Sequence, residues 1–165
     1  VALSGGIACY KVATLLSRLV QGGAAVRVLM TESATRFITP LTLQSLSGQP
    51  VLTSIWQADD HPDSQHIGVA RWCEAMVIAP ASADTIAKLA HGRCEDVVSL
   101  VACALPRETP LLLAPAMNSD MWVNPAADGI HFVGPEEGWQ ACRTRGPGRM
   151  SEPDAILAAL AQRLR

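Results

Sequence analysis

The sequence predicts a doubly wound α/β domain, in which helices cover both faces of a parallel sheet. Short apolar runs of strand length alternate along the chain with segments of helical periodicity, which is typical of β-α units. The runs are apolar throughout, so we expect strands that are buried on both faces. The 165 residues suit one such domain and are too few for two. We therefore expect residues 1–165 to form a single three-layer α/β/α domain, Rossmann-like or flavodoxin-like.

The first half of the chain gives two strands and three helices. The apolar residues 1–3 end at a glycine turn, which predicts the end of a strand. Apolar residues at helical spacing then predict a helix over 7–21, stopped by two glycines. The apolar run 25–30 predicts a second strand, and a proline and a glycine bound a short helix at 40–48. A polar loop, 57–65, precedes the next helix.

The second half repeats this alternation. Two apolar runs closed by proline predict buried strands, and a third run is weaker. The predicted strands are 75–79, 110–114 and 131–133. The predicted helices are 82–90, 96–105 and a final one that Ser151 caps, with Pro153 in its first turn. We expect the residues between, 134–150, to form a loop because glycine and proline punctuate them.

Composition and charge exclude several classes of protein. Hydrophobic residues make up 49% of the chain and charged residues 17%, which is too apolar for a disordered chain. The uncharged stretches are too short to cross a bilayer, so we expect no membrane partner. A net charge of −2 with scattered basic residues argues against nucleic acid. Five cysteines without a C-x-x-C pair predict neither a disulfide framework nor a metal site, and they favour the cytoplasm.

Three polar turns follow predicted strands, and ligands of doubly wound sheets bind beyond such carboxyl ends. Ser4-Gly5-Gly6 offers backbone N–H groups and a helix start, which suits a phosphate, although a plain tight turn has the same pattern. Residues 80–85 repeat the arrangement, and their hydroxyls or carboxylate can equally cap a helix. Asn118, after the strand 110–114, can orient a carboxylate or an amide.

Two reactive side chains lie outside these turns. His66 follows the polar loop, where an imidazole can serve as a general base, although a single histidine is more often structural. The other three histidines lie in no motif. Cys142 lies in a loop of Gly, Pro and Arg residues, and the positive charge of the nearby arginines would favour its thiolate. Met121 and Trp122 are better explained as core packing.

Seven segments together resemble one family. In order they are S-G-G-I-A-C-Y-K (4–11), M-T-E-S-A (30–34), F-I-T-P-L (37–41), H-I (66–67), P-A-S-A-D-T (80–85), P-A-M-N-S-D-M-W (115–122) and Q-A-C…G-P-G-R-M (140–150). The chain resembles the flavin-containing cysteine decarboxylases, most closely the phosphopantothenoylcysteine decarboxylase domain of bacterial coenzyme A biosynthesis. The match covers almost the whole chain in order, and P-A-M-N-x-x-M-W with the downstream cysteine is its specific part.

The resemblance implies an FMN enzyme that converts 4′-phospho-N-pantothenoyl-L-cysteine to 4′-phosphopantetheine. In the family, the flavin takes a hydride equivalent from the CH₂–SH carbon, the resulting thioaldehyde allows CO₂ to leave, and the enethiol product is then reduced. The resemblance also implies a homotrimer or dodecamer and, in bifunctional members, a synthetase domain, here after Arg165. We expect Lys11, Arg143, Arg145 or Arg149 to meet the charge of the substrate.

The resemblance also assigns roles to single residues. It implies that His66 is the catalytic base, that Cys142 donates the proton for the reductive step, and that Asn118 holds the substrate carboxylate. Met121 and Arg149 are also expected at the substrate. The residues expected to bind FMN are Ser4, Gly5, Gly6, Ile7, Thr31, Ser33, Phe37, Ser82, Ala83, Asp84, Thr85, Ala116 and Met117.

Two departures from the family pattern leave other functions open. Arg143-Thr144 stands where the family usually has glycine and an acidic residue, and the segment after Pro125 is short by about one helix. The first departure favours a peptide C-terminal cysteine decarboxylase of the lantibiotic type, which leaves its enethiol unreduced. A non-catalytic flavin-binding regulatory subunit is the second alternative. Because the chain begins at Val1 without methionine, we expect its N-terminus to be incomplete.

Overall fold

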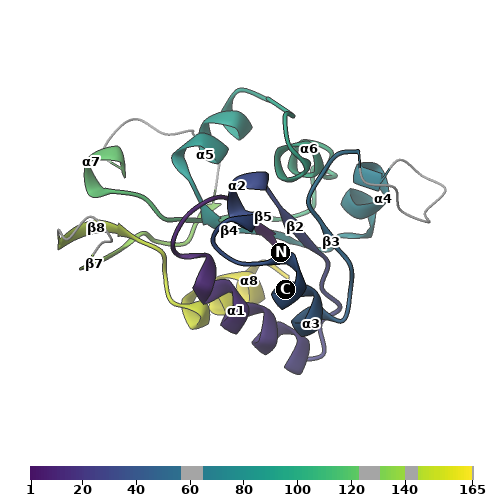
Figure 1. Cartoon of the computed structure of the whole chain (residues 1–165), viewed down its shortest axis with the longest axis horizontal. Coiled ribbons are helices and arrows are strands. Elements are labelled where there is room, and N and C mark those ends of the chain that lie inside the picture. Colours follow the sequence, from purple (N-terminus) through teal and green to yellow (C-terminus); the bar gives the residue numbers. More distant parts are fainter. Residues whose placement is uncertain (57–64, 123–130, 140–144, 165) are drawn as a thin grey trace.

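The computed structural model describes residues 1–56, 65–122, 131–139 and 145–164 (Figure 1). Within these residues, six strands form one sheet in the order β3-β2-β1-β4-β5-β6, and every neighbouring pair is parallel. The strands are β1 (Ala2–Leu3), β2 (Val28–Met30), β3 (Val51–Leu52), β4 (Met76–Ala81), β5 (Leu111–Pro115) and β6 (His131–Phe132). The predicted doubly wound parallel sheet is confirmed. No helix of the described residues is long and apolar enough to cross a membrane.

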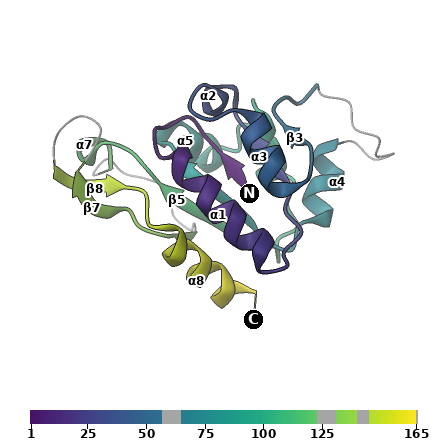
Figure 2. The same cartoon turned by 60° about the horizontal axis from the view of Figure 1, so that its bottom comes forward.

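Helices cover both faces of the sheet, as Figures 1 and 2 show. Successive strand residues alternate between two apolar cores: Leu3 and Met30 enter one, and Ala2 and Leu29 enter the other. The first core lies under α1 (Cys9–Gln21), α3 (Pro40–Ser47) and α8 (Pro153–Arg163). The second lies under α4 (Gln65–Trp72), α5 (Ala83–Ala90) and α6 (Val97–Cys103). This is the three-layer arrangement that the apolar runs predict.

Short-range hydrogen bonds set the start of several helices. Asp96 caps α6, where its Oδ1 accepts from the Ser99 N–H at 2.9 Å and the Ser99 Oγ accepts from the Asp96 N–H at 3.2 Å. Thr39 caps α3 ahead of a proline at its first position, and Gly48 ends this helix with φ +67°. Two helices of one turn, α2 (Glu32–Thr35) and α7 (Ser119–Trp122), follow β2 and β5.

The predicted loop over 134–150 is wrong in part, because it contains an antiparallel hairpin. β7 (Glu136–Trp139) pairs with β8 (Arg145–Arg149), outside the main sheet. The sequence R-G-P-G-R of β8 has low strand propensity, so local preference alone predicts a loop. Contact with a distant residue outweighs that preference, since the Gly148 carbonyl accepts from the Met117 N–H at 2.9 Å. The Arg149 side chain lies over Gly138, where a Cβ would be 2.9 Å from its Cδ.

The predicted cap of the last helix is also wrong. Glu152 occupies the cap position of α8, without a capping hydrogen bond from its side chain, and Pro153 is the first helical residue. Ser151 is buried and its Oγ donates to the Val133 carbonyl at 3.0 Å. A long-range partner therefore replaces the local one that the sequence suggests.

Candidate functional site

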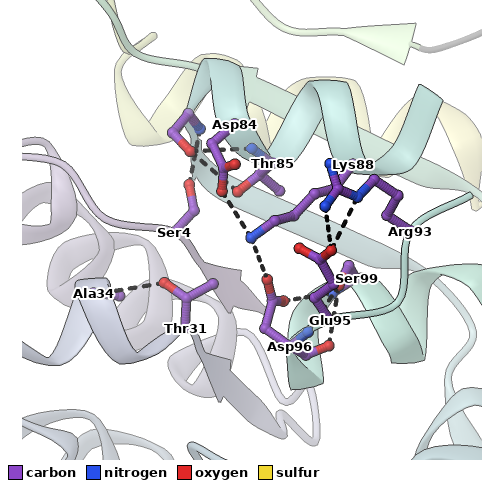
Figure 3. Close-up of polar contacts among 11 residues, drawn as sticks. Ser4, Thr31, Ala34, Asp84, Thr85, Lys88, Arg93, Glu95, Asp96 and Ser99 are labelled. Atoms are coloured by element: carbon purple, nitrogen blue, oxygen red, sulfur yellow. Dashed lines mark hydrogen bonds and ion pairs between the residues drawn. The ribbon is translucent and has the colours of Figure 1, made fainter. Parts of the chain in front are cut away.

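The candidate site lies at the switch point of the sheet, where β1 and β4 are neighbours and the chain winds outward in both directions. Ser4 joins the turns that follow these two strands (Figure 3). Its Oγ donates to the Pro80 carbonyl at 2.7 Å and accepts from the Ser82 N–H at 2.8 Å. Its side chain is buried. Ser4 thus holds the turn after β1 against the turn after β4. Its contact with FMN stays a prediction.

Replacing Ser4 with alanine is expected to lower the free energy of unfolding by about 1–3 kcal/mol, because the Ser82 N–H loses its acceptor and a buried hydroxyl contact disappears. Urea denaturation measures this loss. Ser45→Ala is the matched control, since that hydroxyl is exposed and, among the described residues, bonds only to the Leu41 carbonyl of its own helix. Equal unfolding midpoints for Ser4→Ala and the unchanged protein would contradict the assigned role.

The turn after β1 carries backbone donors that suit an anion. Within the described residues, no hydrogen bond joins the N–H groups of Gly5, Gly6 and Ile7 to another residue. The first turn of α1 follows without a side-chain cap. A Cβ at Gly5 would lie 2.5 Å from the Cβ of Ser33, so this turn touches the one after β2. Free N–H groups at a helix start are the usual partners of a phosphate.

The turn after β2 lies beside the turn after β1 and completes this side of the candidate site. Thr31 is buried and caps α2, with its Oγ1 accepting from the Ala34 N–H at 3.2 Å (Figure 3). Ser33 and Phe37 are exposed beside it. Thr31 therefore holds the turn in shape, and the two exposed side chains are the ones that can reach a ligand.

The turn after β4 begins α5. Its polar residues cap this helix, and that role is compatible with contact to a ligand. Ser82 caps the helix, since its Oγ accepts from the Thr85 N–H at 3.3 Å. Lys88 lies 2.8 Å from the Asp84 carboxylate and 3.1 Å from that of Asp96 (Figure 3). The hydrogen bond with Asp84, with help from Asp96, raises the pKa of Lys88. This pair of contacts joins α5 to the start of α6 and balances the negative charge of Asp84.

The turn after β5 connects the site to the hairpin. The Ala116 N–H donates to the Ala81 carbonyl at 3.1 Å, and the Met117 N–H donates to the Gly148 carbonyl of β8 at 2.9 Å. The Asn118 Oδ1 accepts from the Asp120 N–H at 2.8 Å, which starts α7. Asn118 thus lies between the sheet edge and the hairpin.

Trp122 and Met121 follow Asn118, and both are predicted to pack in the core, while Met121 is also expected at the substrate. Trp122 packs edge to face on Phe132, with ring centroids 5.7 Å apart, so its packing role is confirmed. Met121 is 50% exposed, so its interpretation as core packing is wrong. Its predicted contact with substrate stays a prediction.

Two of the basic residues expected to meet the charge of the substrate form ion pairs within the chain. Lys11 is buried, and its Nζ lies 2.8 Å from Glu152 Oε1 and 3.1 Å from the Met150 carbonyl. Arg149 also pairs with Glu152. The hydrogen bond from Lys11 holds the pKa of Glu152 below its usual range. This cluster was not predicted from the sequence, although a lysine on the apolar face of α1, one turn before Leu15, is a signal of it.

Of the two predicted catalytic residues, one lies within the described residues. His66 lies on the first turn of α4, half-buried. Figures 1 and 2 both show α4 and α7 at opposite ends of the long axis, so one chain does not bring His66 to the turn that carries Asn118. Cys142 lies outside the described residues. The remaining predicted cofactor residues gather at the carboxyl ends of β1, β2, β4 and β5.

Unbonded backbone donors at a switch point, followed by a helix start, are typical of α/β domains that bind the phosphate of a nucleotide. The chain belongs to the Flavoprotein family, whose model matches residues 1–165.

Curated relatives match almost the whole chain. The coenzyme A biosynthesis bifunctional protein CoaBC of Haemophilus influenzae is 42% identical over 169 residues, which cover 97% of this chain and 42% of that protein. The chain therefore spans less than half the length of such bifunctional relatives. The probable phosphopantothenoylcysteine decarboxylase of Streptococcus mutans is 40% identical over 172 residues, which cover 99% of this chain and 96% of that protein.

Solved structures match the fold. One is a PPC decarboxylase mutant, with serine in place of a cysteine, complexed with pantothenoylaminoethenethiol; it has a TM-score of 0.83 and 32% identity, and the match covers 98% of this chain and 94% of that chain. The FMN binding protein AtHal3 has a TM-score of 0.79 and 30% identity, with 98% of this chain and 92% of that chain covered.

Proposed function

We propose that this chain binds FMN and decarboxylates 4′-phospho-N-pantothenoyl-L-cysteine to 4′-phosphopantetheine in coenzyme A biosynthesis. The observation that carries the proposal is the convergence of polar turns from β1, β2, β4 and β5 on one anion-binding point of the sheet. The Streptococcus mutans relative, matched along nearly its full length, supports the substrate. The free thiols of Cys9, Cys73, Cys94 and Cys103 support a cytoplasmic location.

The residues at the switch point fit FMN. Its phosphate would accept from the N–H groups of Gly5, Gly6 and Ile7, with the exposed Ser33 beside them. The start of α5, from Ser82 to Thr85, and Ala116 would line the rest of the flavin. Asp84, balanced by Lys88, would add little net charge next to a negatively charged cofactor.

The chemistry divides between cofactor and protein. When bound, FMN supplies a two-electron acceptor for the CH₂–SH carbon of the substrate and a two-electron donor for the enethiol product. His66 would remove a proton from the substrate during its oxidation, and Asn118 would orient the carboxylate that leaves as CO₂. Cys142 would protonate the enethiol carbon while the double bond is reduced. Each of these roles is carried over from the family motifs.

The test uses protein loaded with FMN and substrate labelled in its carboxyl group. Release of labelled CO₂ that depends on FMN is the expected result. A protein that binds FMN but releases no CO₂ would contradict the proposal and favour a binding role.

We also propose that the active form is a homotrimer or a dodecamer. His66 lies on α4, and Asn118 lies in the turn before α7. These helices lie at opposite ends of the long axis of the molecule, so a second copy is needed to bring the two residues together. Four exposed apolar side chains around the β1 and β2 turns support a contact there: Ile7, Tyr10, Phe37 and Leu41.

The mass of the native protein in solution is expected to be three or twelve times that of the chain, as measured by light scattering after gel filtration. Replacing Tyr10 with glutamate at this apolar surface is expected to reduce the assembly to monomers, because it buries a charge in the contact. An active monomer would contradict the shared site.

A further inference from the structure

Asp84 lies where two requirements on one turn conflict. It is in the first turn of α5, where the positive end of a helix favours a carboxylate. The same turn is joined to Ser4 through the Ser82 N–H, at 2.8 Å, so it lies beside the backbone donors that suit a phosphate. A carboxylate without a compensating charge would repel an anionic cofactor there. The turn therefore needs a fixed positive charge.

Lys88 supplies this charge from one turn further along α5. Its Nζ lies 2.8 Å from the Asp84 carboxylate, and its side chain is 18% exposed, whereas that of Asp84 is 70% exposed. The hydrogen bond with Asp84 raises the pKa of Lys88, so the ammonium stays charged at neutral pH. A largely buried ammonium thus holds an exposed carboxylate.

Asp96 anchors the same ammonium from the other side, as Figure 3 shows. Its Oδ2 accepts from Lys88 Nζ at 3.1 Å, and its Oδ1 accepts from the Ser99 N–H at 2.9 Å. The second bond caps α6, so the Asp96 side chain has one defined orientation. The framework therefore fixes Lys88, and Asp84 is the member of this network that lies at the candidate site.

We propose that Lys88 is a positioning residue, which pairs with Asp84 and so removes the repulsion between this carboxylate and bound FMN. It acts through Asp84 and touches neither the cofactor nor the substrate. This inference rests on the proposed function, because it takes residues 82–85 as part of the flavin site. It extends that function from the residues that contact FMN to the charge that makes their turn suitable for an anion.

The experiment measures the dissociation constant of FMN, by quenching of flavin fluorescence, for the unchanged protein, Lys88→Met and Lys88→Met/Asp84→Asn. At about 0.01 M salt we expect Lys88→Met to bind FMN about threefold to tenfold more weakly, because Asp84 is then an unpaired charge. The double variant lacks that carboxylate and should regain the affinity of the unchanged protein. At about 1 M salt, screening should reduce the loss in Lys88→Met to less than about twofold.

Arg93→Met is the matched control. Arg93 pairs with Glu95 in the connection between α5 and α6, and both side chains are exposed (Figure 3). The variant removes the same charge outside the site, so its affinity for FMN should stay within about twofold of that of the unchanged protein. If Lys88→Met fails to fold because Asp96 loses its partner, the same comparison is made in an Asp96→Asn background, which removes that carboxylate.

Equal affinities of Lys88→Met and the unchanged protein at low salt would overturn the inference. A loss that persists at high salt, or that Asp84→Asn does not restore, would also overturn it, since either result means a purely structural role. Release of CO₂ judges the proposed function separately. If the unchanged protein binds FMN but releases no CO₂, the decarboxylase fails, and the affinities of the variants still decide the role of Lys88. A chain that binds no FMN contradicts both.

Discussion

Replacing His66 with glutamine is expected to reduce release of CO₂ from 4′-phospho-N-pantothenoylcysteine by about 10²–10⁴-fold, which is the usual contribution of a general base. Glutamine keeps the size and polarity of the side chain but cannot accept a proton at neutral pH. His66 lies on α4, away from the turns that would hold the flavin phosphate, so FMN content should not change. Stopped-flow reduction of bound FMN under anaerobic conditions measures the same step directly.

His91→Gln is the control for this variant. His91 is exposed at the end of α5, where its Nδ1 lies 2.8 Å from the Ala87 carbonyl, and it belongs to no motif. It should retain full activity. Turnover by His66→Gln within about threefold of the unchanged protein would rule out the base, since it falls far short of the loss that a general base implies.

Replacing Gly5 with alanine is expected to remove FMN binding and to destabilise the fold by about 1–3 kcal/mol. The added Cβ would lie 2.5 Å from the Cβ of Ser33 and 3.2 Å from its backbone carbonyl carbon, so the turn after β1 must move away from the turn after β2. That movement displaces the backbone donors that suit a phosphate. Flavin absorbance after reconstitution and urea denaturation of the flavin-free protein measure the two effects.

Gly6→Ala is the matched control for stability. Within the described part of the chain its Cβ would meet only Pro80 Cγ, at 3.8 Å, which is ordinary van der Waals contact. The free energy of unfolding of this variant should change by less than about 1 kcal/mol. Adding Ser33→Gly to Gly5→Ala removes the nearest atom and should restore part of the lost stability. A stable, flavin-loaded Gly5→Ala variant would contradict the contact between the two turns.

The sequence was sufficient to predict the layers of the fold, because apolar runs such as 75–79 and 110–114 permit few alternatives to a buried parallel strand. It also predicted that polar residues meet at strand ends, as Ser4 and Ser82 do. Parallel strands bring their carboxyl ends together whatever their exact boundaries, so errors of one or two residues did not matter.

Features that depend on long-range contact could not be predicted in this way. The hairpin strand R-G-P-G-R forms against its local propensity, and Ser151 bonds to Val133 instead of capping α8. Lys11 is a candidate substrate ligand by its charge, but its burial against Glu152 assigns it to the framework. The separation of His66 from Asn118 needs the arrangement of the whole chain, since both belong to motifs of one family.

The mass of the product formed under anaerobic conditions tests the central claim most directly. FMN-loaded protein is incubated with 4′-phospho-N-pantothenoylcysteine, and the product is identified by mass spectrometry. We predict a product that differs from the substrate by loss of CO₂ alone, because both half-reactions are completed. A product that lacks two further hydrogens would mean that the enethiol is released unreduced, as in a peptide-type cysteine decarboxylase. Recovery of unchanged substrate would contradict the proposed catalysis altogether.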